Sequence, residues 1–140
     1  MRLNRLDLLR YGKFTGRSLD FGPARAGRPD FHIVYGPNEA GKSTLFSAFL
    51  DLLFGIDNRS TYGFLHPYET MRIGGVIETG GRTQTVARIK RKQNSLLGPD
   101  DQPLPDNLFS AALGSIDRAT YQMMFSLDDD SIEKGGESIL

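Results

Sequence analysis

Residues 36–44 read GPNEAGKST, and the segments on either side of this stretch indicate the fold. Its first eight residues match the pattern G-x-x-x-x-G-K-[ST], in which a glycine-rich loop curls around a phosphate. The run before the loop, FHIVY (31–35), is apolar and partly β-branched, as expected of a buried parallel strand. The run after it, STLFSAFLDLLFG (43–55), predicts an apolar helix from about Lys42 to Phe54 that is stopped by glycine. A strand, a phosphate loop and a helix in this order predict an α/β fold.

Each part of the loop has a chemical role in this prediction. Backbone N–H groups, chiefly from Asn38 to Ser43, are expected to point at a phosphate, and the helix N-terminus adds its positive dipole end. Lys42 can reach the outer phosphates, and the Ser43 hydroxyl suits Mg²⁺. The loop therefore predicts a site for ATP and Mg²⁺; the alternative is a glycine-rich loop with an incidental lysine. The candidate residues are Gly36, Asn38, Glu39, Ala40, Gly41, Lys42, Ser43 and Thr44.

The rest of the chain predicts a mixed sheet packed on the phosphate-loop helix, with a β-hairpin and short C-terminal helices. Glycines typical of turns and an alternation of apolar residues indicate two early strands, and Gly80-Gly81 is typical of a hairpin turn. The expected elements are strands at 2–9 and within 11–22, an extended loop at 57–70, two hairpin strands within 71–92, a connector at 95–106, and helices at 107–116 and 117–125, the last capped by Asp117.

Composition narrows the classes of function. The 140 residues fit one domain, and the absence of cysteine excludes disulfide scaffolds and thiolate metal sites. Without a signal-peptide pattern or an apolar run of membrane-spanning length, we expect a cytoplasmic protein with no membrane partner. The chain has 17 basic and 17 acidic residues, but residues 1–99 hold fifteen Lys/Arg against eight Asp/Glu. This cationic body, followed by an acidic segment at 100–140, hints at a polyanionic ligand.

Nucleotide binding does not by itself predict hydrolysis. An ATPase also needs an aspartate behind a buried apolar strand and a group that orients water. Asp128 follows a run of apolar residues, but Ser126 interrupts that run, and a solvated acidic turn explains the segment as well. Two alternatives stay open: a self-sufficient P-loop NTPase or kinase that uses Asp128 or Asp129 for Mg²⁺, and a non-catalytic nucleotide-sensing or DNA-binding module.

Several segments together suggest a family. They are the turn RYGKF (10–14), the run IVYGPNEAGKST (33–44), the helix end LLFG (52–55), the segment FLHPYETMRIGG (64–75) and the ending FSLDDDSIEKGGESIL (125–140). The chain resembles the N-terminal lobe of the SMC-like ABC ATPases of chromosome maintenance and double-strand-break repair. The amino-acid sequence of the loop and its flanks is most similar to that of the YhaN-type branch of AAA domains.

The resemblance implies a divided enzyme. In these ATPases a coiled coil separates the N-terminal lobe from a C-terminal lobe that holds the signature, the acidic strand and the catalytic glutamate. Two heads then sandwich two ATP molecules. Residues 1–140 would accordingly be an ATP-binding lobe without catalytic residues of its own, inactive in hydrolysis alone. Its partners would be the C-terminal lobe, a second head in a homodimer, DNA and a nuclease subunit.

The resemblance also implies roles for three residues outside the loop. Lys13 matches the turn that borders the adenine and ribose. Arg59 lies where the family often has an arginine after the first helix. Gln122 is the nearest match to the glutamine that links Mg²⁺ to the middle of the lobe, although it falls several residues early relative to FSLDDD.

A basic run marks the second hairpin strand and its exit. Clustered Lys and Arg side chains could neutralise nucleic-acid phosphates without sequence preference. The alternative is a solvated sheet edge whose charges prevent aggregation. The residues concerned are Arg82, Arg88, Lys90, Arg91 and Lys92.

Overall fold

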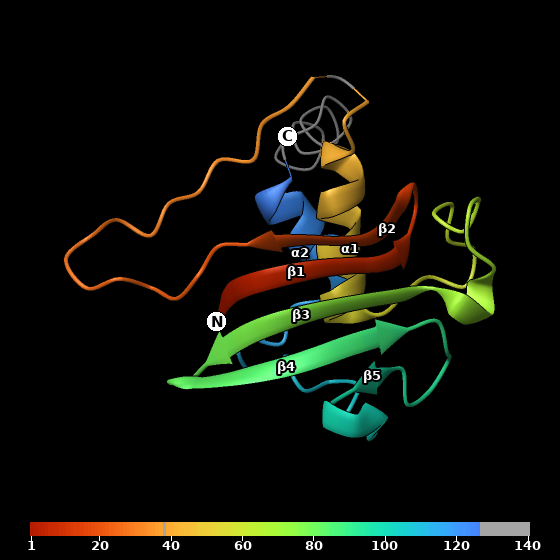
Figure 1. The fold of residues 1–140 in the computed structure, drawn as a ribbon. Coiled ribbons are helices and arrows are strands. Elements are labelled where there is room, and N and C mark those ends of the chain that lie inside the picture. Colours follow the sequence, from red (N-terminus) through yellow and green to blue (C-terminus); the bar gives the residue numbers. More distant parts are fainter. Residues whose placement is uncertain (38, 127–140) are drawn as a thin grey trace, which may run out of the picture.

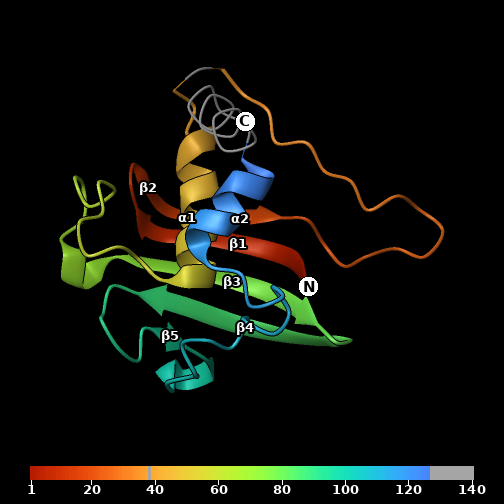
Figure 2. The ribbon, with the colours of Figure 1, turned by 180° about the vertical axis from the view of Figure 1, so that it is seen from behind.

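The computed structural model describes residues 1–37 and 39–126. Its strands form one sheet in the order β2-β1-β3-β4-β5, and two helices lie on the same face of that sheet (Figures 1 and 2). The strands are β1 (Arg2–Tyr11), β2 (Phe14–Asp20), β3 (Arg72–Thr79), β4 (Arg82–Ile89) and β5 (Leu96–Leu97); the helices are α1 (Lys42–Phe54) and α2 (Arg118–Phe125), with short 3-10 turns η1 (Tyr68–Thr70) and η2 (Pro99–Asp101). No helix in this part of the chain is long and apolar enough to cross a membrane.

The core lies between α1 and the sheet. One stripe of α1 packs against apolar side chains of β1, β3 and β4, since these residues alternate toward the same face. The core members are Leu6, Leu8, Tyr11, Ala48, Leu52, Leu53, Ile56, Met71, Ile73, Ile77, Val86, Leu96 and Phe109. Because α1 begins at the phosphate loop, this packing fixes the direction in which the helix N-terminus faces.

Several local predictions are confirmed. Helix α1 runs from Lys42 to Phe54 and ends at Gly55, whose N–H donates to the Asp51 carbonyl. Strands β3 and β4 form the expected hairpin, and both turn glycines have positive φ. Helix α2 is capped as predicted by Asp117, which accepts from the Thr120 N–H at 2.8 Å.

Other expectations are wrong. Residues 107–116 form successive turns rather than a helix, and Gly114 and Ser115 end them with positive φ. The described sheet is antiparallel throughout, not mixed. Residues 31–35 do not form a strand within it and run outside the sheet (Figure 1). The sheet is built by sequence-adjacent hairpins, apart from the β1–β3 pairing, and so provides no parallel neighbour for this run.

Gly75, in the middle of β3, sets how closely α1 approaches the sheet. A Cβ at this position would lie 2.7 Å from the Leu52 Cδ2 atom of α1 and 3.2 Å from the Arg5 carbonyl oxygen. At the adjacent Gly74 the nearest atoms belong to the Asp7 side chain on the other face, at 3.3 Å.

We predict that Gly75→Ala lowers the free energy of unfolding by about 1–3 kcal/mol, because the added methyl overpacks the helix–sheet interface. Gly74→Ala is the matched control and should stay within about 1 kcal/mol of the wild type, since the Asp7 side chain can move aside there. Urea denaturation of both variants measures the difference. Equal losses would contradict this account of the interface.

Candidate phosphate-binding site

The phosphate loop turns sharply into α1. Glu39 and Gly41 both have positive φ, at 70° and 107°, and the Ala40 N–H donates to the Pro37 carbonyl at 3.1 Å. Gly41 is the N-cap of α1, and no side chain of the described residues caps the first turn. A Cβ at Gly41 would lie 2.5 Å from the ring of Phe14, so glycine is needed here both for its conformation and for its size. The uncapped N–H groups of the first turn are available to an anion.

Two lysines meet at this loop. The Lys42 Nζ donates to the Gly36 carbonyl oxygen at 2.6 Å, which closes the loop across its width. The Lys13 Nζ, from the turn between β1 and β2, donates to the Glu39 carbonyl oxygen. Both side chains are exposed. The structure thus brings Lys13 to the loop, and its predicted position beside the adenine and ribose stays a prediction.

A cavity of about 250 Å³ lies beside these groups, lined by Lys13, Glu39, Gly41, Lys42, Ser43 and Thr44. Its lining combines two ammonium groups, two hydroxyls and an uncapped helix N-terminus. Ammonium and N–H donors suit phosphate oxygens, and a serine hydroxyl suits Mg²⁺. The residues present therefore fit a magnesium-bound phosphate chain. Of the predicted loop residues, Asn38 lies outside the described residues.

The turn before β2 is held tightly against the loop. The Gly12 N–H donates to the Tyr62 carbonyl at 2.8 Å. A Cβ at Gly12 would lie 2.9 Å from the Thr44 Cγ2 atom, and Gly12 itself has φ of 56°. Tyr62 in turn stacks on the ring of Tyr11, with centroids 4.9 Å apart. The turn therefore has little freedom to move independently of α1.

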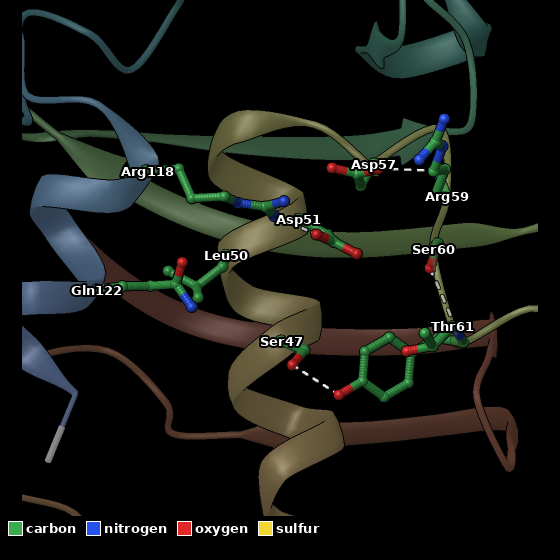
Figure 3. Close-up of a pocket in the computed structure, with 10 residues that line it drawn as sticks. Ser47, Leu50, Asp51, Asp57, Arg59, Ser60, Thr61, Arg118 and Gln122 are labelled. Atoms are coloured by element: carbon green, nitrogen blue, oxygen red, sulfur yellow. Dashed lines mark hydrogen bonds and ion pairs between the residues drawn. The ribbon is translucent and has the colours of Figure 1, made fainter. Parts of the chain in front are cut away.

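A polar cluster in the core was missed by the sequence reasoning. The buried Tyr11 hydroxyl donates to Asp51 Oδ2 at 2.6 Å. The Arg118 guanidinium reaches from α2 to Asp51 Oδ1 (Figure 3). Burial raises the pKa of Asp51, against the lowering effects of Tyr11 and Arg118. Burial and the neighbouring carboxylate raise the pKa of Tyr11 strongly, so its hydroxyl stays a donor. The available signal was an aspartate inside the apolar run FLDLLF (49–54).

Arg59 and Gln122 do not line the cavity at the phosphate loop. Both line a different pocket of about 200 Å³ between α1, α2 and the segment after α1, together with Ser47, Leu50, Asp51, Asp57, Ser60, Thr61, Tyr62 and Arg118 (Figure 3). Gln122 extends from α2, and Arg59 stands near Asp57, which accepts the Arg59 backbone N–H at 2.7 Å. Their predicted contacts with nucleotide and metal remain predictions.

Arg88 must be removed from the predicted basic surface. Its side chain is 1% exposed and lies at the C-terminal end of α1, where it donates to the carbonyl oxygens of Leu52 and Leu53 at 2.9–3.1 Å and to Ser95 Oγ at 2.9 Å. Burial lowers the pKa of Arg88 to about 10, so it remains charged at neutral pH. A cation here complements the negative end of the helix dipole. The alternation Val86-Ala87-Arg88, which puts Arg88 on the same face as Val86, was the available signal.

The remaining basic residues do not all gather in one place, because Arg82 is separate from Lys90, Arg91 and Lys92. Arg82 lies at the hairpin turn, at the opposite end of β4 from the others. The Lys90 Nζ donates to the Asn58 carbonyl at 2.9 Å and lies 4.4 Å from the ring centroid of Tyr68. Arg91 and Lys92 are exposed and line a hollow of about 520 Å³ beside the end of α1.

The glycine-rich loop, its lysine and the helix that follows define a P-loop NTPase. The family described as AAA domain matches residues 1–140, and the chain belongs to this family. AAA ATPase domains generally bind ATP and Mg²⁺, so the chain belongs to a nucleotide-binding class of domain.

The chain is also similar to a protein of Bacillus subtilis (strain 168) named "Uncharacterized protein YhaN", with 27% identity over 133 residues. The match covers 91% of this chain and 13% of that protein, so the chain spans only a small part of its relative's length.

We predict that Arg88→Ala lowers the free energy of unfolding by about 3 kcal/mol or more, because a charged donor to two buried carbonyls is lost. Arg91→Ala, at an exposed arginine three residues further along, should change it by less than about 0.5 kcal/mol. Chemical denaturation compares the two variants. A similar cost for both would show that the Arg88 contacts contribute nothing.

Proposed function

We propose that residues 1–140 are the ATP- and Mg²⁺-binding half of an SMC-like ATPase head, completed by a C-terminal lobe and by a second head. The observation that carries this proposal is the state of residues 31–35, the run that leads into the phosphate loop. Phe31, Ile33 and Tyr35 are 76%, 70% and 89% exposed. Between described residues, no backbone hydrogen bond involves this run.

The large apolar side chains of this run are exposed to water, which is unfavourable, and its backbone groups have no protein partner among the described residues. Its composition suits a strand buried on both faces of a parallel sheet, which needs neighbouring strands on each side. The described sheet ends at β2 on one edge and β5 on the other, and neither pairs with this run. Before the run, Arg2 holds Asp30 through an ion pair of 2.7 Å. These facts support strands from a second lobe as the missing neighbours.

The loop residues have distinct roles in the proposed function. Lys42 and Lys13 exchange their carbonyl contacts for phosphate oxygens, and the first-turn N–H groups of α1 donate to the same anion. Ser43 supplies a hydroxyl oxygen to the metal. Bound Mg²⁺ would neutralise charge on the phosphates and orient them. Asn38, Glu39, Ala40 and Thr44 complete the loop in this proposal.

Hydrolysis requires a further group that orients water. We assign that group to the C-terminal lobe, with the nucleotide completed by the opposite head. The competing candidates, Asp128 and Asp129, lie outside the described residues. A role of the whole protein in DNA repair or recombination follows from the resemblance to SMC-like ATPases alone and is part of this proposal.

Binding is tested with a fluorescent ATP analogue or by calorimetry in the presence of Mg²⁺. Lys42→Ala should weaken binding by roughly 10- to 100-fold, because a charged hydrogen bond to phosphate is worth about 1.5–3 kcal/mol. The matched control is Lys92→Ala, an exposed lysine away from the loop, which should bind like the wild type. Equal affinity of Lys42→Ala and wild type would overturn the assigned site.

Turnover separates the half-head from the self-sufficient enzyme. The 140-residue chain should bind Mg-ATP and release no phosphate above background. Asp128→Ala should change neither property. If the chain hydrolyses ATP at ordinary rates and Asp128→Ala abolishes this, the compact P-loop NTPase is the correct description.

A basic surface at the exit of β4 favours a second function. We infer that Lys90, Arg91 and Lys92 contact nucleic-acid phosphates, since they are consecutive and line or adjoin the hollow at the end of α1. Against this, Lys90 is already engaged with Asn58 and Tyr68. The double variant Arg91→Ala/Lys92→Ala should therefore weaken duplex DNA binding. The slope of log affinity against log salt concentration should fall by the equivalent of about two phosphate contacts. The control is Arg82→Ala, at the other end of β4. Unchanged DNA binding in the double variant would sink this proposal.

A further inference from the structure

A chain of direct contacts connects the phosphate loop with α2. It begins at the turn between β1 and β2, where Lys13 is bonded to the Glu39 carbonyl and Phe14 packs on Gly41. Gly12 fills the space beside Thr44 and is bonded to Tyr62. A displacement of the loop must therefore displace this turn, because neither side has room to absorb it.

The next contact passes from the turn into the core. Tyr11 directly precedes the turn, is fully buried, and donates to Asp51 in the last turn of α1. Its ring is fixed by stacking on Tyr62, whose hydroxyl lies 2.9 Å from Ser47 Oγ. The Tyr11 hydroxyl and the Asp51 carboxylate thus have one mutual arrangement in this structure.

The last contact is made by α2. Arg118, the first residue of this helix, pairs with the other oxygen of Asp51. No residue of α2 is fully buried. Apart from the Arg118–Asp51 pair, α2 contacts α1 mainly through the Tyr121 ring, which packs on Phe49 and Phe54. The Arg118 Nε atom is buried and has no partner among the described residues. An ion pair with an unsatisfied donor is a weak anchor, so the position of α2 is sensitive to how Asp51 is held.

We propose that Asp51 is a positioning residue that couples nucleotide occupancy of the phosphate loop to the docking of α2 on α1, through Tyr11 on one side and Arg118 on the other. The proposal rests on the proposed nucleotide site. Phosphate bound by Lys42, Lys13 and the loop holds the turn in place, which orders the Tyr11–Asp51 contact and with it the acceptor for Arg118. By linkage, docking of α2 strengthens nucleotide binding by the same factor.

The experiment measures millisecond hydrogen exchange of the α2 amides, with and without saturating Mg-ATP, on the 140-residue chain. In the wild type, Mg-ATP should slow this exchange by at least about fivefold, the lower end of common coupling strengths. Tyr11→Phe removes one hydroxyl and keeps the stacked ring. This variant should lose the nucleotide dependence of α2 exchange and bind Mg-ATP more weakly by the factor measured in the wild type.

Tyr121→Phe is the matched control. It removes a hydroxyl from the ring that packs α2 on α1, and this hydroxyl makes no hydrogen bond among the described residues. Both the exchange response and the affinity should therefore remain those of the wild type. Asp51→Asn provides a second test at the centre of the chain and should behave like Tyr11→Phe; circular dichroism establishes that each variant is folded.

The outcomes are distinct. If the wild type binds no Mg-ATP by calorimetry, the proposed function fails before the coupling is tested. If it binds Mg-ATP and α2 exchange is unchanged, the coupling is wrong and the nucleotide site stands. The coupling is also wrong if folded Tyr11→Phe retains the full response, or if Tyr121→Phe loses it to the same extent.

Discussion

The buried guanidinium of Arg88 joins the sheet to the C-terminal end of the helix that begins at the phosphate loop. Its N–H groups donate to the Leu52 and Leu53 carbonyl oxygens, which have no N–H donor within the helix. The positive charge also offsets the negative end of the helix dipole. With this end fixed in the core, the opposite end of α1 points its uncapped N–H groups outward, where a phosphate can meet them.

The close approach of α1 to the sheet depends on two further features. Gly75 leaves space for Leu52, and Asp51 is held by Tyr11 from β1 and by Arg118 from α2. An acidic side chain in an apolar interface is tolerable only when both oxygens have donors. The same interface thus carries the apolar packing of the domain and the polar contacts that reach from the phosphate loop to α2.

The phosphate loop joins this ordered body to an exposed run. On its C-terminal side α1 is anchored by the sheet, whereas on its N-terminal side residues 31–35 contribute apolar side chains to no core among the described residues. The phosphate loop is therefore packed against an ordered core on the side of α1 and is exposed on the side of residues 31–35. Membership of the family establishes the nucleotide-binding class of the module.

Local patterns in the sequence determined much of what the structure contains. The bounds of α1, the hairpin at Gly80-Gly81, the Asp117 cap and the phosphate loop could be predicted, because each depends on neighbours within a few residues. The helix expected at 107–116 is wrong: the segment forms successive turns, which Gly114 and Ser115 end with positive φ.

Tertiary structure alone decided the roles of Arg88, Asp51 and residues 31–35. The local sequence around a basic residue in a charged run, or around an acidic residue in an apolar helix, does not show whether that side chain is solvated or buried. Their partners, Leu52 for Arg88 and Tyr11 for Asp51, lie 36 and 40 positions away in the chain. The run at 31–35 has every property of a strand, but a strand requires neighbours with which to share its backbone hydrogen bonds. The sequence by itself determined which segments can form helices, strands and a phosphate loop; only the folded chain determined which of them find partners, because partnership depends on contacts between residues far apart in sequence.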